Sequence, residues 1–172
     1  MASWSIETYR KTILEFLDET FETHHGIFVD KGTSLCPTLA AVSAEEASSR
    51  AGERNATPAA HVRHVILYLR VMQKDIRGEE VGKVDWREIW ENDVPVSPAE
   101  WTKLLAELRA EHAELVRFMN DPATWERDGV IGGSMAIMAH TAYHLGAIRH
   151  GLLAIRYGGA VAKAGSGSQS KP

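Results

Sequence analysis

The chain has 172 residues, a length that fits one domain and is large enough to bury a core without disulfides. With 19 Lys and Arg against 23 Asp and Glu, its formal net charge of −4 gives no electrostatic reason to expect binding to nucleic acid or to an anionic membrane. The single cysteine, Cys36, excludes an internal disulfide, so we expect a cytoplasmic protein. The eight histidines are the unusual feature, and any metal site in this chain must be built mainly from imidazole.

We expect neither a targeting segment nor a membrane span. Residues 1–12 lack the apolar stretch of a secretory signal. No window in the sequence approaches the roughly 18 uncharged apolar residues that a membrane span needs.

The first helix is predicted over residues 5–23. Its apolar side chains recur at steps of three and four residues, the spacing of one face of an amphipathic helix, and Gly26 follows as a stop. These side chains are Ile6, Tyr9, Ile13, Phe16, Leu17 and Phe21.

A long connection, residues 27–56, is predicted next. Within it, Ser43 and Glu46 have the spacing of a capping box, which predicts a short helix near residues 44–50. The length of this connection leaves open whether it crosses the helical bundle or joins adjacent helix ends.

A second long helix is predicted from Thr57 to about Arg77. Thr57 is a favoured N-cap and Pro58 is favoured at the first helical position, whereas Gly78 ends the last turn. The apolar face carries His61, Val62, Val65, Tyr68, Leu69, Met72 and Ile76.

A second connection, residues 83–96, carries Trp86 and Trp90 four residues apart. This spacing predicts a helical turn that packs both rings over one end of the bundle.

A third helix is predicted from Ser97 to Asp121. Ser97 and Glu100 have capping-box spacing, and Pro98 occupies the first helical position. The apolar stripe consists of Trp101, Leu104, Leu105, Leu108, His112, Leu115 and Met119.

The last helix is predicted to begin after Gly129 and to run to Tyr157, with Gly158 and Gly159 as its stop. It is rich in Ala, Met, Ile and Leu. Residues 159–172 are small and polar, and we predict a disordered tail there.

These elements predict an all-α fold. No segment shows sustained strand alternation, and no repeat of roughly 20 to 50 residues is visible. Four amphipathic helices with one long and one medium connection favour a four-helix bundle, formed as a single domain by residues 1–158.

The strongest local motif is the pair of histidines His140 and His144. At i and i+4 on one helix the two imidazoles lie on the same face and can bind one metal ion. Ile137 and Ile148 share that face, which indicates that the pair points inward. The alternative is two core histidines that hydrogen-bond to backbone or water.

A second pair, His61 and His64, lies near the start of the second predicted helix. Either can reach across to His140 and His144, and three imidazoles from two helices leave metal positions open for water or substrate, as in a catalytic site. The alternative is that one of the pair packs under the helix end and the other is solvated.

The remaining histidines have simpler interpretations. His24 and His112 extend apolar stripes and are interpreted as packing residues, while His25 and His150 are interpreted as solvated. Cys36 has no neighbouring base or positive field in the sequence and is interpreted as incidental. Phosphate-binding loops and nucleophile elbows are missing from the sequence.

Two segments resemble the motifs of one family. Residues 140–150, HTAYHLGAIRH, are similar to the last-helix motif of the DinB/YfiT-like metalloenzymes. Residues 56–65, ATPAAHVRHV, resemble their second-helix motif, in which a Ser or Thr cap precedes the ligand histidine by seven residues, the separation of Thr57 and His64. The resemblance covers about residues 3–158.

This resemblance implies a four-helix bundle with an unusual connection order. It implies that His64, His140 and His144 bind a divalent metal, usually nickel or zinc, with water completing the shell. His61 is an additional histidine in this chain, which leaves open which of His61 and His64 binds. The resemblance also implies a homodimer and a small-molecule substrate, since relatives include transferases and isomerases that use low-molecular-weight thiols.

Three functional hypotheses follow. The first is a metal-dependent enzyme that transfers a low-molecular-weight thiol to an electrophile, or hydrolyses a substrate, with His61 or Tyr143 moving a proton or orienting the leaving group. The second is a binding module that senses a small molecule or stress without turnover. The third is a helical dimer in which the histidines only pack.

Overall fold

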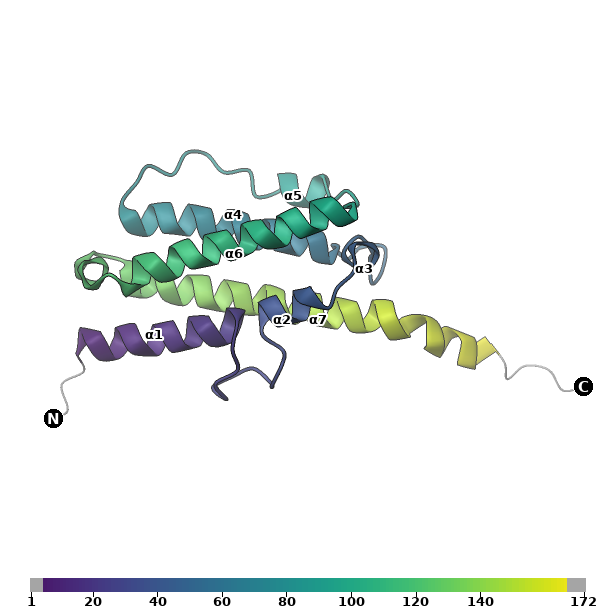
Figure 1. Cartoon of the computed structure of the whole chain (residues 1–172). Coiled ribbons are helices and arrows are strands. Elements are labelled where there is room, and N and C mark those ends of the chain that lie inside the picture. Colours follow the sequence, from purple (N-terminus) through teal and green to yellow (C-terminus); the bar gives the residue numbers. More distant parts are fainter. Residues whose placement is uncertain (1–4, 167–172) are drawn as a thin grey trace, which may run out of the picture.

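The computed structural model describes the backbone of residues 5–166 and the side chains of residues 5–157. All regular structure in this part of the chain is helical, as predicted. Four long helices lie side by side (Figure 1), with α4 packed against α6 and α7, and α1 also packed against α6 and α7. These helices are α1 (Ile6–Phe21), α4 (Pro58–Arg77), α6 (Pro98–Asn120) and α7 (Val130–Ser166).

Shorter helices occupy the connections. The predicted short helix of the first connection is present as α3, whereas α2 was not anticipated from the sequence. The Trp-bearing connection forms a helical turn, as expected. These elements are α2 (Leu35–Ala40), α3 (Ala44–Ala47), α5 (Glu88–Glu91) and the 3₁₀ helix η1 (Pro122–Glu126).

Side-chain caps fix where the helices start. The Thr57 hydroxyl accepts the Ala60 N–H at 3.1 Å and begins α4 at the predicted position. Ser97 forms a capping box with Glu100 at the start of α6, and Ser43 begins α3 in the same way. These local signals explain why the predicted helix starts are confirmed.

The end of the last helix differs from the prediction. The backbone of α7 continues as helix through Ser166, past the predicted end at Tyr157. Two glycines in a helix cost only about 1 kcal/mol each relative to alanine, which is too little to end a helix without a cap. Residues 167–172 lie outside the described residues, and disorder there stays a prediction.

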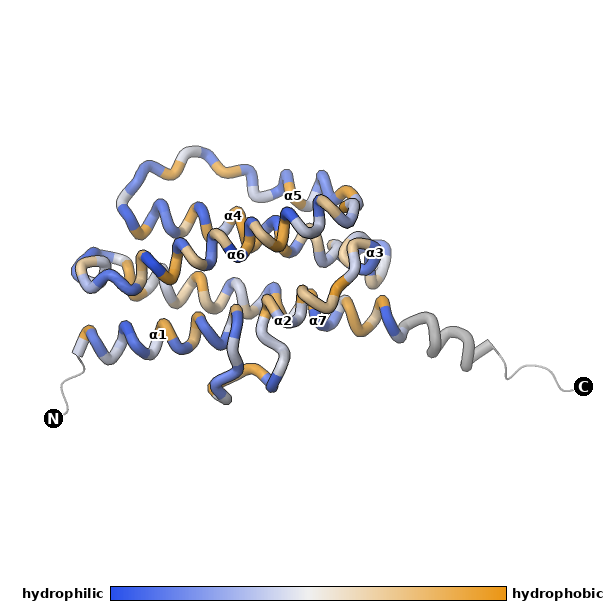
Figure 2. The backbone as a smooth tube through the Cα atoms, in the orientation of Figure 1, coloured by the Kyte–Doolittle hydropathy of each residue, from blue (hydrophilic) through white to orange (hydrophobic). Residues whose placement is uncertain are grey.

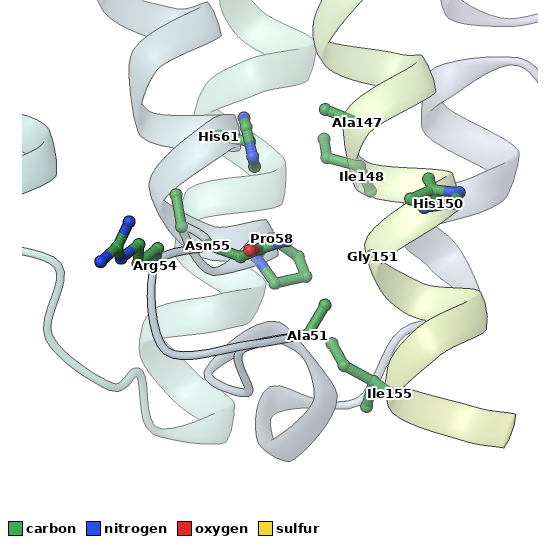
Figure 3. A pocket seen from close by; sticks show the side chains of 11 residues that line it. Ala51, Arg54, Asn55, Pro58, His61, Ala147, Ile148, His150, Gly151 and Ile155 are labelled. Carbon is green, nitrogen blue, oxygen red and sulfur yellow. The ribbon is translucent and has the colours of Figure 1, made fainter. Parts of the chain in front are cut away.

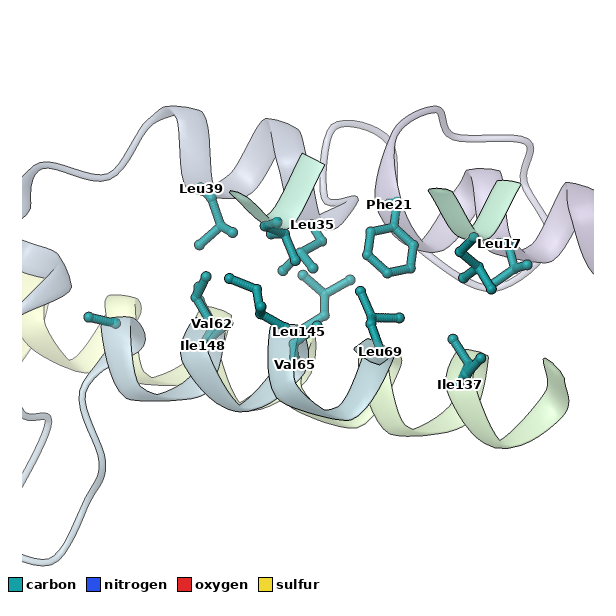
Figure 4. Close-up of a cluster of buried hydrophobic side chains, with 14 of the residues drawn as sticks. Leu17, Phe21, Leu35, Leu39, Val62, Val65, Leu69, Ile137, Leu145 and Ile148 are labelled. Carbon is teal, nitrogen blue, oxygen red and sulfur yellow. The ribbon is translucent and has the colours of Figure 1, made fainter. Parts of the chain in front are cut away.

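The core lies between the four long helices α1, α4, α6 and α7, and α2 also contributes buried side chains to it. Leu17 and Phe21 of α1 and Leu35 of α2 are fully buried against α4 and α7 (Figure 4). Because α1 is short, α2 extends its layer along α7 (Figure 1). Hydrophilic and hydrophobic segments alternate along α1 and α6, as expected for helices with one buried face (Figure 2).

Among residues 5–166, no helix combines the length and the apolar character that a membrane crossing requires.

A buried carboxylate organises the turn after α1. The Glu19 side chain is fully buried and accepts the backbone N–H groups of Ile27, Phe28 and Val29 at 2.9 to 3.1 Å. Burial alone raises the pKa of Glu19, but these N–H donors, with His24 nearby, outweigh it and hold the pKa below its ordinary value. Because the partners lie beyond the helix end, helical periodicity gave no sign of this contact.

Glu19→Gln is expected to lower the melting temperature by roughly 5 °C at neutral pH, because the amide presents one acceptor oxygen to three donors. A carboxyl group with a lowered folded pKa stabilises the fold above its ordinary pKa of 4.5 and loses this contribution as pH falls through the folded value. The difference in melting temperature between Glu19→Gln and wild type is therefore expected to become smaller below pH 4.5. Glu15→Gln, an exposed position on the same helix, is the control and is expected to change little. A constant difference between pH 7 and pH 3 would contradict this account.

Helices α4 and α7 approach closely at Gly133. A Cβ atom at this position would lie 2.6 Å from Cγ1 of Ile76, whereas a Cβ at the adjacent Gly132 would meet nothing within 4 Å. The missing side chain of Gly133 thus allows the contact between the two helices that carry the histidines.

The two neighbouring glycines are expected to respond to alanine with opposite signs. Gly133→Ala forces Ile76 to move and is expected to lower the free energy of unfolding by about 1 to 2 kcal/mol. Gly132→Ala is expected to raise it by about 0.5 to 1 kcal/mol through helix propensity alone. Urea unfolding of both variants measures the difference, and equal effects would refute the close approach.

Candidate metal centre

Three histidines converge between α4 and α7. Nε2 of His140 lies 3.0 Å from Nε2 of His64 and 3.1 Å from Nε2 of His144. Within the described residues, these are the side chains whose ligand atoms, all within 4.8 Å of one another, can hold a metal ion. His64 and His144 are buried and His140 is half-buried. The structure therefore brings together the three residues that the sequence singled out.

The cluster is uncharged at neutral pH. Burial, followed by the neighbouring imidazoles, lowers the pKa of His140 to about 4 and that of His144 to about 3. Burial also lowers the pKa of His64. Neutral imidazole is the form in which histidine binds metals.

The three imidazoles cannot satisfy all of their close nitrogen–nitrogen contacts with hydrogen bonds. A neutral imidazole nitrogen carries either one hydrogen or one lone pair, so Nε2 of His140 can serve only one of its two nitrogen neighbours. Nδ1 of His64 is also buried without a hydrogen-bond partner. Contacts among the three rings therefore leave at least one buried nitrogen unsatisfied.

The donor set fits a divalent transition-metal ion. Three neutral imidazoles this close together can all offer a nitrogen lone pair to one cation. Ligand nitrogens about 2.05 Å from a tetrahedral ion are separated by about 3.3 Å. The distances from Nε2 of His140 to Nε2 of His64 and of His144, 3.0 and 3.1 Å, are close to this value, and the ligand atoms of all three residues lie within 4.8 Å of one another. Imidazole ligands suit zinc and nickel.

His61 lies outside the triad but contacts it. Its Nδ1 is 2.9 Å from Nδ1 of His144, the nitrogen of His144 that faces away from His140. Burial, then the nearby His64, lowers the pKa of His61. A group bonded to the second nitrogen of a ligand histidine fixes its tautomer and orientation. The geometry thus separates the two residues: His64 belongs to the group of three close histidines, whereas His61 contacts the far nitrogen of His144.

Aromatic rings cover the histidines. The Trp90 ring centroid lies 4.7 Å from that of His64 and 5.4 Å from that of His61, and Trp86 lies 5.7 Å from His64. The connection that contains α5 therefore packs its tryptophans against the cluster. Tyr68, one turn after His64, stacks on His140 at 3.7 Å. Sequence reasoning assigned Tyr68 only to the apolar face, although its i+4 spacing from His64 was a usable signal.

Tyr143 is placed differently from the expectation for a proton-transfer group. Its side chain is 71% exposed on α7, and its ring meets His144 edge-on at 5.1 Å. Residues adjacent in a helix point about 100° apart, so the residue before an inward-facing His144 points outward.

The other histidines lie apart from the cluster. His112 is buried and stacks on Phe21 at 4.2 Å, as expected for a packing residue. His24 was expected to continue the stripe of the first helix but is exposed, because α1 ends at Phe21. His25 and His150 are exposed, as expected.

Cys36 is buried, and burial, followed by Glu22, raises the pKa of its thiol to about 12. A thiol in this environment is protonated at neutral pH and is a poor nucleophile. The interpretation of Cys36 as incidental agrees with this environment.

Comparison with known proteins found no matching family model, no matching curated protein and no matching solved structure. The similarity to the DinB/YfiT-like family thus depends on the two helical motifs and stays a prediction.

Proposed function

We propose that His64, His140 and His144 bind one divalent metal ion, zinc or nickel, and that the chain is a metal-dependent enzyme of the DinB/YfiT type. One observation carries this proposal: Nε2 of His140 lies within 3.1 Å of two other Nε2 atoms, although it can form only one hydrogen bond. The burial of the cluster supports it, because unsatisfied buried nitrogens are costly in a stable fold.

Three protein ligands leave a coordination position for water or substrate, which is typical of catalytic rather than structural sites. Such an ion supplies a Lewis acid that lowers the pKa of a bound water or thiol. The environment of Cys36 indicates that a sulfur nucleophile must arrive with the substrate. We therefore propose transfer of a low-molecular-weight thiol to an electrophile, with metal-assisted hydrolysis as the alternative reaction.

The surrounding residues have supporting roles in this proposal. His61 holds His144 through the contact between their Nδ1 atoms. Trp86 and Trp90 keep water from the histidines, and Tyr68 fixes the ring plane of His140 by stacking. Water exclusion strengthens electrostatic interactions inside the site.

We include a homodimer in the proposal, with α7 as its contact helix. Several large apolar side chains on α7 are exposed, a feature of association surfaces. They are Met135, Tyr143, Leu153 and Tyr157. Sedimentation velocity at micromolar protein tests this point, and a monomer would contradict it.

The experiment begins with chelator-treated protein titrated with cobalt(II), zinc and nickel. We expect one equivalent to bind and the cobalt form to absorb in the visible range. Glutathione is then added to the cobalt form and its spectrum followed, before a panel of epoxide, alkyl halide and ester substrates is tested for product. Protein that stays metal-free after incubation with zinc and nickel would refute the proposal. A glutathione-dependent spectral change without product from any substrate would favour a binding module over an enzyme.

A further inference from the structure

A pocket of about 260 Å³ lies beside the histidine cluster, between the first turn of α4 and the C-terminal half of α7 (Figure 3). Pro58 and His61 line it from α4, and Ala147, Ile148, Gly151 and Ile155 line it from α7. A dry cavity of about 150 Å³ is enough to hold benzene. The pocket is therefore large enough for one aromatic ring with a small substituent.

Small residues on α7 create this space. Gly151 lines the pocket, and a Cβ atom at this position would meet nothing within 4 Å. Ala147, one turn earlier, contributes only a methyl group. Larger side chains at these two positions would fill the space between the helices, so the hollow depends on the identity of these residues.

The interior of the pocket is apolar apart from His61. The other polar lining residues, Arg54, Asn55 and His150, are exposed to solvent and form the rim. His61 is only partly buried, and its Nδ1 contacts His144. Within the described residues, no hydrogen bond involves its Nε2, and this atom is not among the fully buried nitrogens. Nε2 is thus the open polar atom of a ring that lines an apolar pocket.

The contact with His144 determines what Nε2 of His61 offers. Nε2 of His144 belongs to the converging triad, so when that nitrogen binds a metal its hydrogen resides on Nδ1. Nδ1 of His144 then donates to Nδ1 of His61, which must accept. Neutral His61 consequently carries its hydrogen on Nε2 and is a hydrogen-bond donor.

We propose that this pocket binds a small apolar molecule, of the size of one aromatic ring or a short aliphatic chain, through an oxygen that accepts a hydrogen bond from Nε2 of His61. The acceptor preference rests on the proposed metal function, because the tautomer of His61 follows from metal binding at His144. The apolar selectivity follows from the lining residues alone. The ligand class that fits the pocket is therefore a carbonyl-bearing compound with a compact apolar group, bound next to the histidine that contacts His144.

The test uses two fluorinated probes, para-fluoroacetophenone and para-fluoroethylbenzene, which differ by the carbonyl oxygen. Fluorine NMR titrations measure their dissociation constants for zinc-loaded wild-type protein. We expect the ketone to bind about fivefold more tightly, the value of one net hydrogen bond. His61→Leu is expected to abolish this preference while the ring still binds.

Gly151→Leu is expected to weaken the binding of both probes at least tenfold, because its side chain fills the pocket. Gly146→Leu is the control. Gly146 is exposed on the same helix, a Cβ there would meet nothing within 4 Å, and the variant is expected to leave the binding of both probes unchanged. Ala51 lines the pocket from the loop before α4, at the end where Ile155 lies (Figure 3). Ala51→Leu fills the pocket from that end and is used if Gly151→Leu does not fold. Zinc affinity is measured for each variant. It is expected to equal that of wild type for Gly151→Leu, Gly146→Leu and Ala51→Leu.

The pocket proposal fails if both filling variants bind the probes like wild type, or if zinc-loaded wild type binds the two probes equally. The proposed metal function fails separately if wild type binds no zinc. In that case the probe titrations of metal-free wild type and Gly151→Leu still decide whether the apolar pocket binds ligands.

Discussion

Replacing His140 with alanine is expected to weaken zinc binding by roughly 100-fold or more, and His64→Ala and His144→Ala are expected to do the same. Loss of an outer-shell partner typically costs about 10- to 100-fold in metal affinity, so loss of a direct ligand costs at least as much. Each variant also removes one of three closely spaced neutral imidazoles, so the metal-free fold is expected to keep near-normal stability. Zinc competition against a chromophoric chelator measures the affinity, and circular dichroism monitors the fold.

His150→Ala is the matched control on the same helix, because His150 is exposed and lies outside the cluster. Its zinc affinity is expected to equal that of wild type. His61→Ala tests whether His61 binds the metal or only positions His144. A residue that acts through His144 is expected to cost about tenfold in zinc affinity, less than the loss of a ligand. Three ligand variants with wild-type zinc affinity would show that the histidines only pack.

The second large effect is expected at Asp93, which attaches the Trp-bearing connection to the start of α4. Its carboxylate is 1% exposed, accepts the Thr57 N–H at 3.0 Å and the Thr57 hydroxyl at 2.6 Å, and lies 2.9 Å from Arg50. Since the Thr57 hydroxyl donates to Asp93, its lone pair is free to accept the Ala60 N–H and cap the helix. Asp93 therefore holds both the cover of the cluster and the helix that supplies His64.

Asp93→Ala is expected to lower the free energy of unfolding by about 2 to 4 kcal/mol, because it leaves two buried donors of Thr57 and the Arg50 guanidinium without their acceptor. Urea unfolding measures this change. The emission of Trp90, three residues earlier, is expected to shift to longer wavelength as the connection detaches. Asp85→Ala, in the exposed part of the same connection, is expected to stay within about 0.5 kcal/mol of wild type. Equal stability of the two variants would contradict an anchoring role for Asp93.

Helix starts were predictable because their signals are local. Thr57 with Pro58, and Ser97 with Glu100, place donors, acceptors and fixed backbone angles within one turn. The six-residue helix α2 was missed because no side-chain cap marks its start. The end of α7 was misplaced because glycine lowers helix stability without specifying a stop.

The site was predictable in part for the same reason. The i, i+4 spacing of His140 and His144 fixes their common face within one helix. The choice between His61 and His64 needed the position of α7 relative to α4, which depends on packing at residues such as Gly133. The contact of Asp93 with Thr57 joins residues that are 36 apart in the sequence. Helical periodicity relates only residues within one helix and cannot predict such a contact.

The ligand arrangement also determines when the site can assemble during synthesis. His64 and His140 are 76 residues apart, and His144 follows one turn later. A nascent chain that has emerged from the ribosome only through α6 has one of the three ligands, and its tryptophans have no α7 to close against. Under the proposed function, the metal ion can therefore bind all three histidines only after the last helix has been translated.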